Sequence, residues 1–203
     1  MTNVQDVRVV AFRRGWRVVD IVVASVLGVA SGVVFWALGL AWTPLTNALA
    51  FFQPAGGLIV GGWLFAGVLG GLVIRKPGAA VYTEILAAVV EMLAGNQWGF
   101  STFIWGLVQG LATELVFLLL AYRRWGLGVA AVAGLVTGIA SSLLDTVFGS
   151  YTAWSPTWKL SYIGFAAASG LVIAGVLMWL AVRALAATGA LAPFAAGRAG
   201  REV

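Results

Sequence analysis

The sequence predicts an all-α integral membrane protein, built as a bundle of six transmembrane helices. Its 203 residues are 62% hydrophobic and 9% charged, and the mean hydropathy is +1.01, a composition typical of membrane spans. The apolar stretches are long enough to cross a bilayer, and Lys and Arg gather at their ends. No polar linker divides the chain, so we expect a single domain over residues 1–190.

The six predicted spans are separated by short polar or turn-forming segments. They lie at about residues 20–41, 57–74, 79–95, 100–121, 127–148 and 162–186, and each is near the ~20 residues that a spanning helix needs. The first follows a basic segment but is too long for a signal-peptide core, so we interpret it as an uncleaved helix. Pro77 and Gly78 predict the turn before the third span, which is the shortest. Residues 191–203 are rich in small residues and predict a disordered cytoplasmic tail.

Basic residues fall almost entirely on one side of the six predicted spans. Only Lys159 lies on the other side; the rest are Arg8, Arg13, Arg14, Arg17, Arg75, Lys76, Arg123, Arg124, Arg183, Arg198 and Arg201. Because basic residues favour the cytoplasmic side, the sequence predicts a multi-pass protein of the cell membrane with both termini in the cytoplasm (N-in/C-in). The connections at 42–56, 96–99 and 149–161 are then extracellular. The long, aromatic first and last of these indicate either lids or an interfacial aromatic belt.

Several functional classes find no support in the composition. The chain has no Cys and no His, which removes thiolate metal sites, disulfides and the commonest metal ligand. It has no phosphate-binding GxxxxGK[ST] loop, no HExxH zinc motif and no Ser–His pair. We therefore expect neither an enzyme nor a bound metal or cofactor. The basic residues lie at helix ends and form no separate face, so nucleic-acid binding is not expected.

Carboxylates inside the spans are the strongest functional indication, because an intramembrane acid is costly and usually faces a cavity or a partner. Glu84 and Glu91 are two helical turns apart and share one face of the third span, about 10 Å apart along its axis. Glu114 is expected at the same depth in the membrane as Glu84, and Gln109 is expected closer to the extracellular side than Glu114. Asp145 lies near the outer end of the fifth span. Two alternatives stay open: Glu84 or Glu114 protonated and bonded to a neighbouring helix, or Asp145 capping its own loop.

Aromatic residues accompany this polar seam. Gln97 and Trp98 lie in the short outer turn after the third span, and Trp63 lies near the outer start of the second. Aromatic faces bind planar or cationic rings, and carboxylates accept hydrogen bonds from amino groups. The combination predicts a pocket for a small cationic or hydrogen-bonding aromatic solute.

Small residues form a stripe along the first span. Ala24, Gly28 and Gly32 are spaced four residues apart, and such a stripe lets another helix approach closely. The stripe fits packing inside the bundle or contact with a separate partner protein. The basic segment just before this span makes a partner interface at least as well supported as internal packing.

A family resemblance rests on the polar residues of the third and fourth spans. Arg17 to Asp20, Arg75-Lys76-Pro77-Gly78, Glu84, Glu91, Gly95, Gln97-Trp98-Gly99, Gln109-Gly110 and Glu114 resemble the pattern of the YkoE-type substrate-binding (S) components of energy-coupling-factor (ECF) transporters. The resemblance covers nearly the whole chain and is most specific over residues 75–114.

The resemblance implies a six-helix S component that captures thiamine or its hydroxymethylpyrimidine precursor outside the cell. Such a subunit delivers its ligand through a membrane T component driven by two partner ATPase subunits. The resemblance also implies that Ala24, Gly28 and Gly32 contact the T component. The alternative function is a stand-alone proton- or cation-coupled carrier that uses Glu84 and Glu114 as coupling groups.

Overall fold

The computed structural model describes residues 15–198, and Arg8, Arg13, Arg14 and Arg201 lie outside this range. Its helices are α1 (Val18–Ala48), η1 (Ala50–Gly56), α2 (Gly57–Val60), η2 (Gly61–Trp63), α3 (Phe65–Ile74), α4 (Ala79–Ala94), α5 (Ser101–Leu119), α6 (Leu127–Val147), α7 (Pro156–Ser169), η3 (Gly170–Leu177), α8 (Met178–Ala187) and α9 (Ala195–Arg198). The described chain contains helices and turns without a β-strand. The predicted all-α class is confirmed.

Five helical segments are long and apolar enough to cross a membrane. They are Val18–Ala48, Ala50–Ile74, Ser101–Leu119, Leu127–Val147 and Pro156–Ala187. The predicted span at 79–95 corresponds to α4, whose 16 residues are fewer than a perpendicular crossing requires. The protein is therefore a multi-pass membrane protein, while the sixth span and the orientation of the termini stay predictions.

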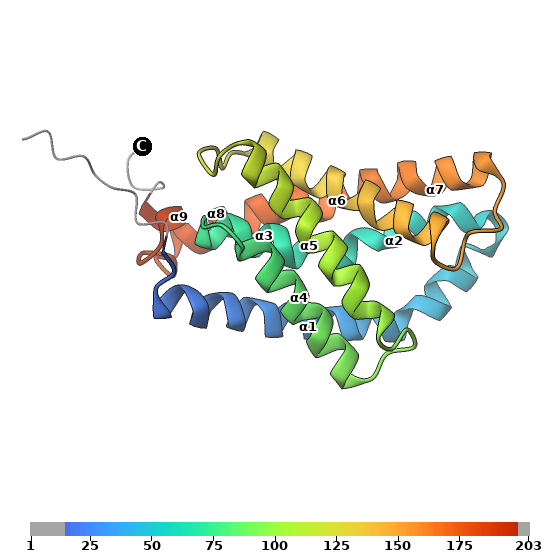
Figure 1. The fold of residues 1–203 in the computed structure, drawn as a ribbon, viewed down its shortest axis with the longest axis horizontal. Coiled ribbons are helices and arrows are strands. Elements are labelled where there is room, and N and C mark those ends of the chain that lie inside the picture. Colours follow the sequence, from blue (N-terminus) through green and yellow to red (C-terminus); the bar gives the residue numbers. More distant parts are fainter. Residues whose placement is uncertain (1–14, 199–203) are drawn as a thin grey trace, which may run out of the picture.

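The helices form an elongated bundle (Figure 1). The helix order brings the turns before α4 and α6 to the end where α8 and α9 lie, while the turns after α4 and α6 lie toward the other end. α4 and α5 cross the middle of the bundle obliquely in Figure 1 and pack on each other. α6 packs against both α5 and the α7–η3 segment.

The predicted outer connection at 42–56 is largely helical. α1 continues through Pro44 to Ala48, and η1 follows after Leu49. The hydroxyl of Thr46 donates to the carbonyl oxygen of Trp42 at 2.9 Å, one turn earlier in the helix. The last span likewise begins at Pro156, because Ser155 caps the helix and proline suits its first position.

The second span is bent where its glycines meet α7. Ser169 donates its hydroxyl to the Gly57 carbonyl oxygen at 2.8 Å and accepts from the Gly61 amide at 3.1 Å. A Cβ atom on Gly61 would lie 2.6 Å from the Ser169 carbonyl oxygen, so only glycine permits this approach. The bend places Trp63 at the end of η2, next to α1 and α4.

The small-residue stripe of α1 is buried against α4, while its predicted contact with a T component stays a prediction. Ala24, Gly28 and Gly32 are buried. A Cβ atom on Gly32 would lie 2.6 Å from the Ala87 carbonyl oxygen, and one on Gly28 would lie 3.0 Å from the Leu86 side chain. Glycine at these two positions therefore allows α1 and α4 to pack closely within the chain.

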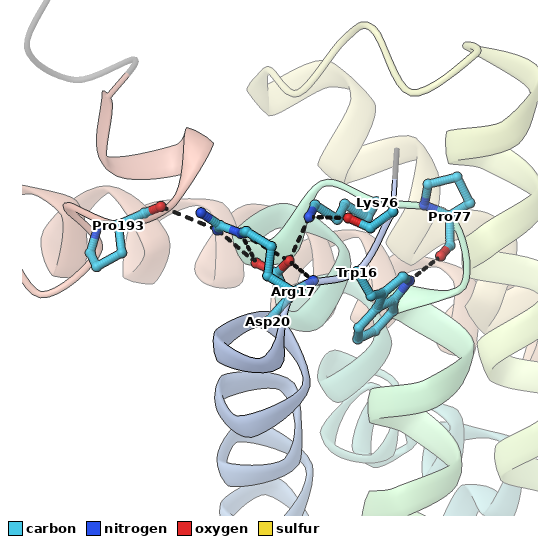
Figure 2. Close-up of polar contacts among 7 residues, drawn as sticks. Trp16, Arg17, Asp20, Lys76, Pro77 and Pro193 are labelled. Carbon is cyan, nitrogen blue, oxygen red and sulfur yellow. Dashed lines mark hydrogen bonds and ion pairs between the residues drawn. The ribbon is translucent and has the colours of Figure 1, made fainter. Parts of the chain in front are cut away.

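An ion cluster joins the two ends of the described chain (Figure 2). Asp20 is fully buried and pairs with Arg17 at 2.7 Å and with Lys76 at 2.5 Å. Arg17 also donates to the carbonyl oxygen of Pro193, and Trp16 donates its indole N–H to that of Pro77 at 3.0 Å. The start of α1, the turn before α4 and the C-terminal segment are thereby fastened together, as Figure 2 shows.

The predicted disordered tail at 191–203 is described as far as Arg198 and packs on the bundle. Leu191 and Phe194 are buried with the main core. Arg75 reaches this segment through a hydrogen bond to the Ala195 carbonyl oxygen at 3.5 Å. Leu191 and Phe194 thus give this small-residue segment apolar surface to bury, while the predicted disorder of the tail stays a prediction.

Candidate functional site

A cavity of about 480 Å³ opens between α1, α2, η2, α4, α5, α6, the turn after α6 and α7. This volume lies within the range of small-molecule sites. Its lining is polar and aromatic: Phe35, Trp42, Val60, Trp63, Ala88, Glu91, Trp98, Ser101, Thr102, Trp105, Gln109, Ser141, Asp145, Phe148, Gly149, Ser150, Tyr151 and Tyr162. Of the predicted site residues, Trp63, Glu91, Trp98, Gln109 and Asp145 meet here.

Glu91 forms the α4 side of this cavity. It lies in the last turn of α4 and is 1% exposed. The indole N–H of Trp63 donates to its Oε1 atom at 3.0 Å. On α1, a Cβ atom at Gly39 would lie 3.3 Å from the same oxygen. Glycine at this position therefore leaves space for the Glu91 carboxylate.

Three tryptophans from distant parts of the chain gather beside Glu91. The ring centroids of Trp42, Trp63 and Trp98 are 5.7–6.0 Å apart, and all three pairs meet edge to face. The amide N–H groups of Trp98 and Gly99 donate to Asn96 Oδ1, which fixes the turn carrying Trp98. The edge-to-face arrangement suits the ring quadrupoles and gives a rigid apolar wall.

Asp145 forms the opposite, α6 side of the cavity. Trp105 donates its indole N–H to Oδ1 at 2.7 Å, and Tyr162 donates its hydroxyl to Oδ2 at 2.8 Å. In the adjoining turn, burial and the charge of Asp145 raise the pKa of Tyr151 to about 12, so this phenol stays neutral at physiological pH. Asp145 therefore does more than cap its own loop, because it accepts hydrogen bonds from α5 and α7.

The polar lining continues along α5. Gln109 donates from Nε2 to the hydroxyl of Ser141 at 2.9 Å. Trp105 lies one turn from Gln109 on the same face of α5, and this i, i+4 spacing was the available signal for its place in the site. Tyr162, by contrast, reaches the cavity through tertiary packing of α7, for which the sequence holds no local pattern.

The charge of the lining is unbalanced. Among the residues that line the cavity are two carboxylates, Glu91 and Asp145, and neither Lys nor Arg. Burying carboxylates without counter-charges is costly. The lining is therefore complementary to a solute that brings positive charge or N–H donors.

Three predicted site residues lie away from this cavity. Glu84 is 1% exposed and its Oε2 accepts from the Gly67 amide, while Oε1 has no hydrogen-bond partner within the described residues. Gln97 lines a smaller hollow of about 190 Å³ with Trp36 and Thr43, on the other side of Gly39.

Glu114 lies at the start of α4 instead of at the depth of Glu84. It accepts hydrogen bonds from the amides of Gly78 and Ala80 at 2.6 and 3.0 Å and from the Tyr122 hydroxyl at 2.6 Å. Burial and the contact with Glu114 raise the pKa of Tyr122, so this phenol remains a donor. Glu114 thus serves the N–H groups at the start of α4.

The misplacement of Glu114 has a simple geometric origin. Gly106 packs on Ala88 and Gly110 packs on Val81 and Glu84, which sets the antiparallel register of α4 and α5. In this register Glu114 falls one turn beyond Glu84. These contacts join two helices, so the periodicity within either helix does not reveal the register.

Comparison with known proteins gives a consistent result. The profile of a family described as "ABC-type cobalt transport system, permease component" matches residues 19–140. A Bacillus subtilis (strain 168) protein, provisionally named HMP/thiamine permease protein YkoE, is 37% identical over 187 residues, covering 91% of this chain and 92% of the relative.

A solved structure agrees with the sequence relationship. A crystal structure of an S component of an ECF transporter superposes with a TM-score of 0.87 and 34% identity, over 93% of this chain and 94% of the other. The chain therefore belongs to the YkoE family of S components, the substrate-binding membrane subunits of ECF transporters.

Proposed function

We propose that this S component captures thiamine or its hydroxymethylpyrimidine precursor in the cavity between Glu91 and Asp145. The observation that carries the proposal is the pairing of two carboxylates, the buried Glu91 and the half-buried Asp145, with aromatic walls and no lining cation. Thiamine offers a fixed positive charge, two planar rings and an amino group. The name of the Bacillus subtilis relative points to the same ligands.

Cobalt, named in the family description, is less well matched to this chain. Imidazole and thiolate are favoured ligands of such metals, and the chain has no His and no Cys. Within residues 15–198, no group of three acidic residues is close enough to hold a metal ion. An organic cation is the better partner for two carboxylates that reach the cavity from different helices.

The proposed topology follows from the charge distribution and the helix ends. A single six-helix domain with both termini in the cytoplasm places the turns after α4 and α6, and with them the cavity, toward the extracellular side. The loaded subunit would then deliver its ligand through a membrane T component driven by two ATPase subunits. ATP hydrolysis in this scheme takes place in the partner subunits.

Tryptophan fluorescence of the detergent-purified protein tests ligand capture. Trp42, Trp63, Trp98 and Trp105 line the cavity, so a bound pyrimidine should change their emission. We expect saturable quenching by thiamine or hydroxymethylpyrimidine at nanomolar to micromolar concentrations, and none by riboflavin or Co²⁺. A folded protein that responds to neither pyrimidine compound contradicts the proposal.

A reconstitution experiment separates the S-component role from a stand-alone carrier. Proteoliposomes with this chain alone should bind thiamine without accumulating it under a proton or sodium gradient. Accumulation should require the T component, both ATPase subunits and ATP. The ATP must be supplied on the side of the liposome membrane where the ATPase subunits lie. Gradient-driven uptake by the chain alone would favour the carrier function.

A further inference from the structure

The two cavity carboxylates belong to separate parts of the site. Glu91 comes from α4 and Asp145 from α6, and these helices pack on α5, which carries Trp105 and Gln109 between them. Each carboxylate has its own set of aromatic neighbours. The cavity therefore holds two acidic subsites, one on either side of α5.

The hydrogen bonds give these subsites different chemistry. On Glu91, the hydrogen bond from Trp63 goes to Oε1, and the carboxylate lines the cavity, where its oxygens can also accept from a ligand N–H group. On Asp145, Trp105 donates to Oδ1 and Tyr162 donates to Oδ2, so each oxygen already has a donor. This arrangement suits a carboxylate that acts through its charge more than through a new hydrogen bond.

The rings around Asp145 are also suited to a flat cation. Tyr151 and Tyr162 line the cavity beside it, and their ring centroids are 4.9 Å apart in an edge-to-face arrangement. Trp154 stacks on Tyr151 with ring centroids 4.0 Å apart and also meets Tyr162 edge to face, which holds both rings in place. Aromatic faces beside a carboxylate attract a cation that has no N–H to donate.

Thiamine contains both complementary groups. Its aminopyrimidine carries N–H donors, which need an acceptor such as the Glu91 carboxylate. Its thiazolium ring carries a permanent positive charge and no N–H, which matches Asp145 and the surrounding rings. Hydroxymethylpyrimidine contains the first of these groups and lacks the second.

Building on the proposed thiamine capture, we propose that Asp145 is the specificity-determining residue that selects thiamine over its pyrimidine precursor by binding the thiazolium cation. Glu91 recognises the aminopyrimidine that both ligands share. The chain is thus a receptor for the complete vitamin, and the precursor is the weaker ligand.

The test measures three ligands on the wild type, Asp145→Asn and Glu91→Gln. The ligands are thiamine, hydroxymethylpyrimidine and a thiamine analogue in which an uncharged thiophene replaces the thiazolium ring. Asparagine keeps the shape of the side chain: its oxygen accepts from Trp105 and its amide group donates to the Tyr162 oxygen. Binding is measured by calorimetry on detergent-purified full-length protein.

We expect Asp145→Asn to weaken thiamine binding at least about tenfold and to leave hydroxymethylpyrimidine and the uncharged analogue within about twofold of the wild type. Retained binding of these two ligands also shows that the variant is folded. Glu91→Gln should weaken all three. On the wild type alone, thiamine should bind at least about tenfold more tightly than the uncharged analogue.

Two results would overturn the role of Asp145. One is equal affinity of the wild type for thiamine and the uncharged analogue, a measurement that needs no variant. The other is an equal loss of all three ligands in a folded Asp145→Asn protein. Failure of the wild type to bind thiamine or hydroxymethylpyrimidine at all would instead refute the proposed function.

Discussion

The indole N–H of Trp63 donates to Oε1 of Glu91 at 3.0 Å. This bond connects η2 with the last turn of α4, two segments that the chain separates by 28 residues. It orients the carboxylate toward the cavity, while the Trp63 ring meets Trp42 and Trp98 in edge-to-face pairs. The acidic and aromatic parts of the site are therefore built as one unit.

Replacing Trp63 by Phe should separate the hydrogen bond that its indole N–H donates to Glu91 from the aromatic contacts of its ring. The substitution keeps an aromatic ring but removes the donor to Glu91, and hydrogen bonds to charged groups contribute about 1.5–3 kcal/mol. We expect thiamine affinity to fall about tenfold, measured by calorimetry. Trp36→Phe is the matched control, since the Trp36 indole bonds to the Gly95 carbonyl oxygen outside the main cavity. Equal losses in both variants would remove the special role of Trp63.

The two glutamates of α4 should respond differently to the same change. Glu91→Gln removes a charge that lines the cavity, and we expect ligand affinity to fall by about tenfold or more. Glu84→Gln alters a residue that bonds to the Gly67 amide away from the lining, so the affinity of the folded variant should stay within about twofold. Fluorescence titration of both variants measures this. A stronger effect at Glu84 would mean that the ligand reaches deeper than the cavity.

A side chain at Gly32 should damage the isolated subunit itself. Its Cβ atom would meet the Ala87 carbonyl oxygen and the Val90 side chain, and overpacking of this kind costs about 1–3 kcal/mol. We expect Gly32→Leu to lower the thermal unfolding temperature in detergent and to weaken ligand binding by displacing α4. Val26→Leu is the control, because Val26 is 60% exposed on the same helix. Normal stability of Gly32→Leu with loss of T-component binding would instead support the predicted partner interface.

The ion cluster around Asp20 should matter for stability and not for ligand affinity. Lys76→Met keeps an aliphatic side chain but removes the ammonium group that faces a fully buried carboxylate. We expect a loss of about 1–3 kcal/mol in the free energy of unfolding, while thiamine affinity stays unchanged. Thermal unfolding of Lys76→Met, Asp20→Asn and the double variant gives the coupling between the residues. Additive losses would show that the pair contributes nothing of its own.

The sequence by itself determined the class of this protein. Hydropathy and length were sufficient for an all-α membrane protein, because a bilayer leaves helices as one of only two backbone solutions. Intramembrane carboxylates and nearby tryptophans identified Glu91, Asp145, Trp63, Trp98 and Gln109 as site candidates, and all five line the cavity. These inferences depend on composition and on spacing within one helix, which a sequence displays directly.

The tertiary structure alone decided which polar residues share the cavity and which pack elsewhere. Glu114 caps α4 because the α4–α5 register is fixed by the packing of Gly106 and Gly110. The Gly32 stripe faces α4 because close contact with that helix is what excludes a side chain. Tyr162 on α7 donates its hydroxyl to Asp145 on α6. Register and helix facing arise from contacts between distant segments, and the pattern within any single helix leaves them undetermined.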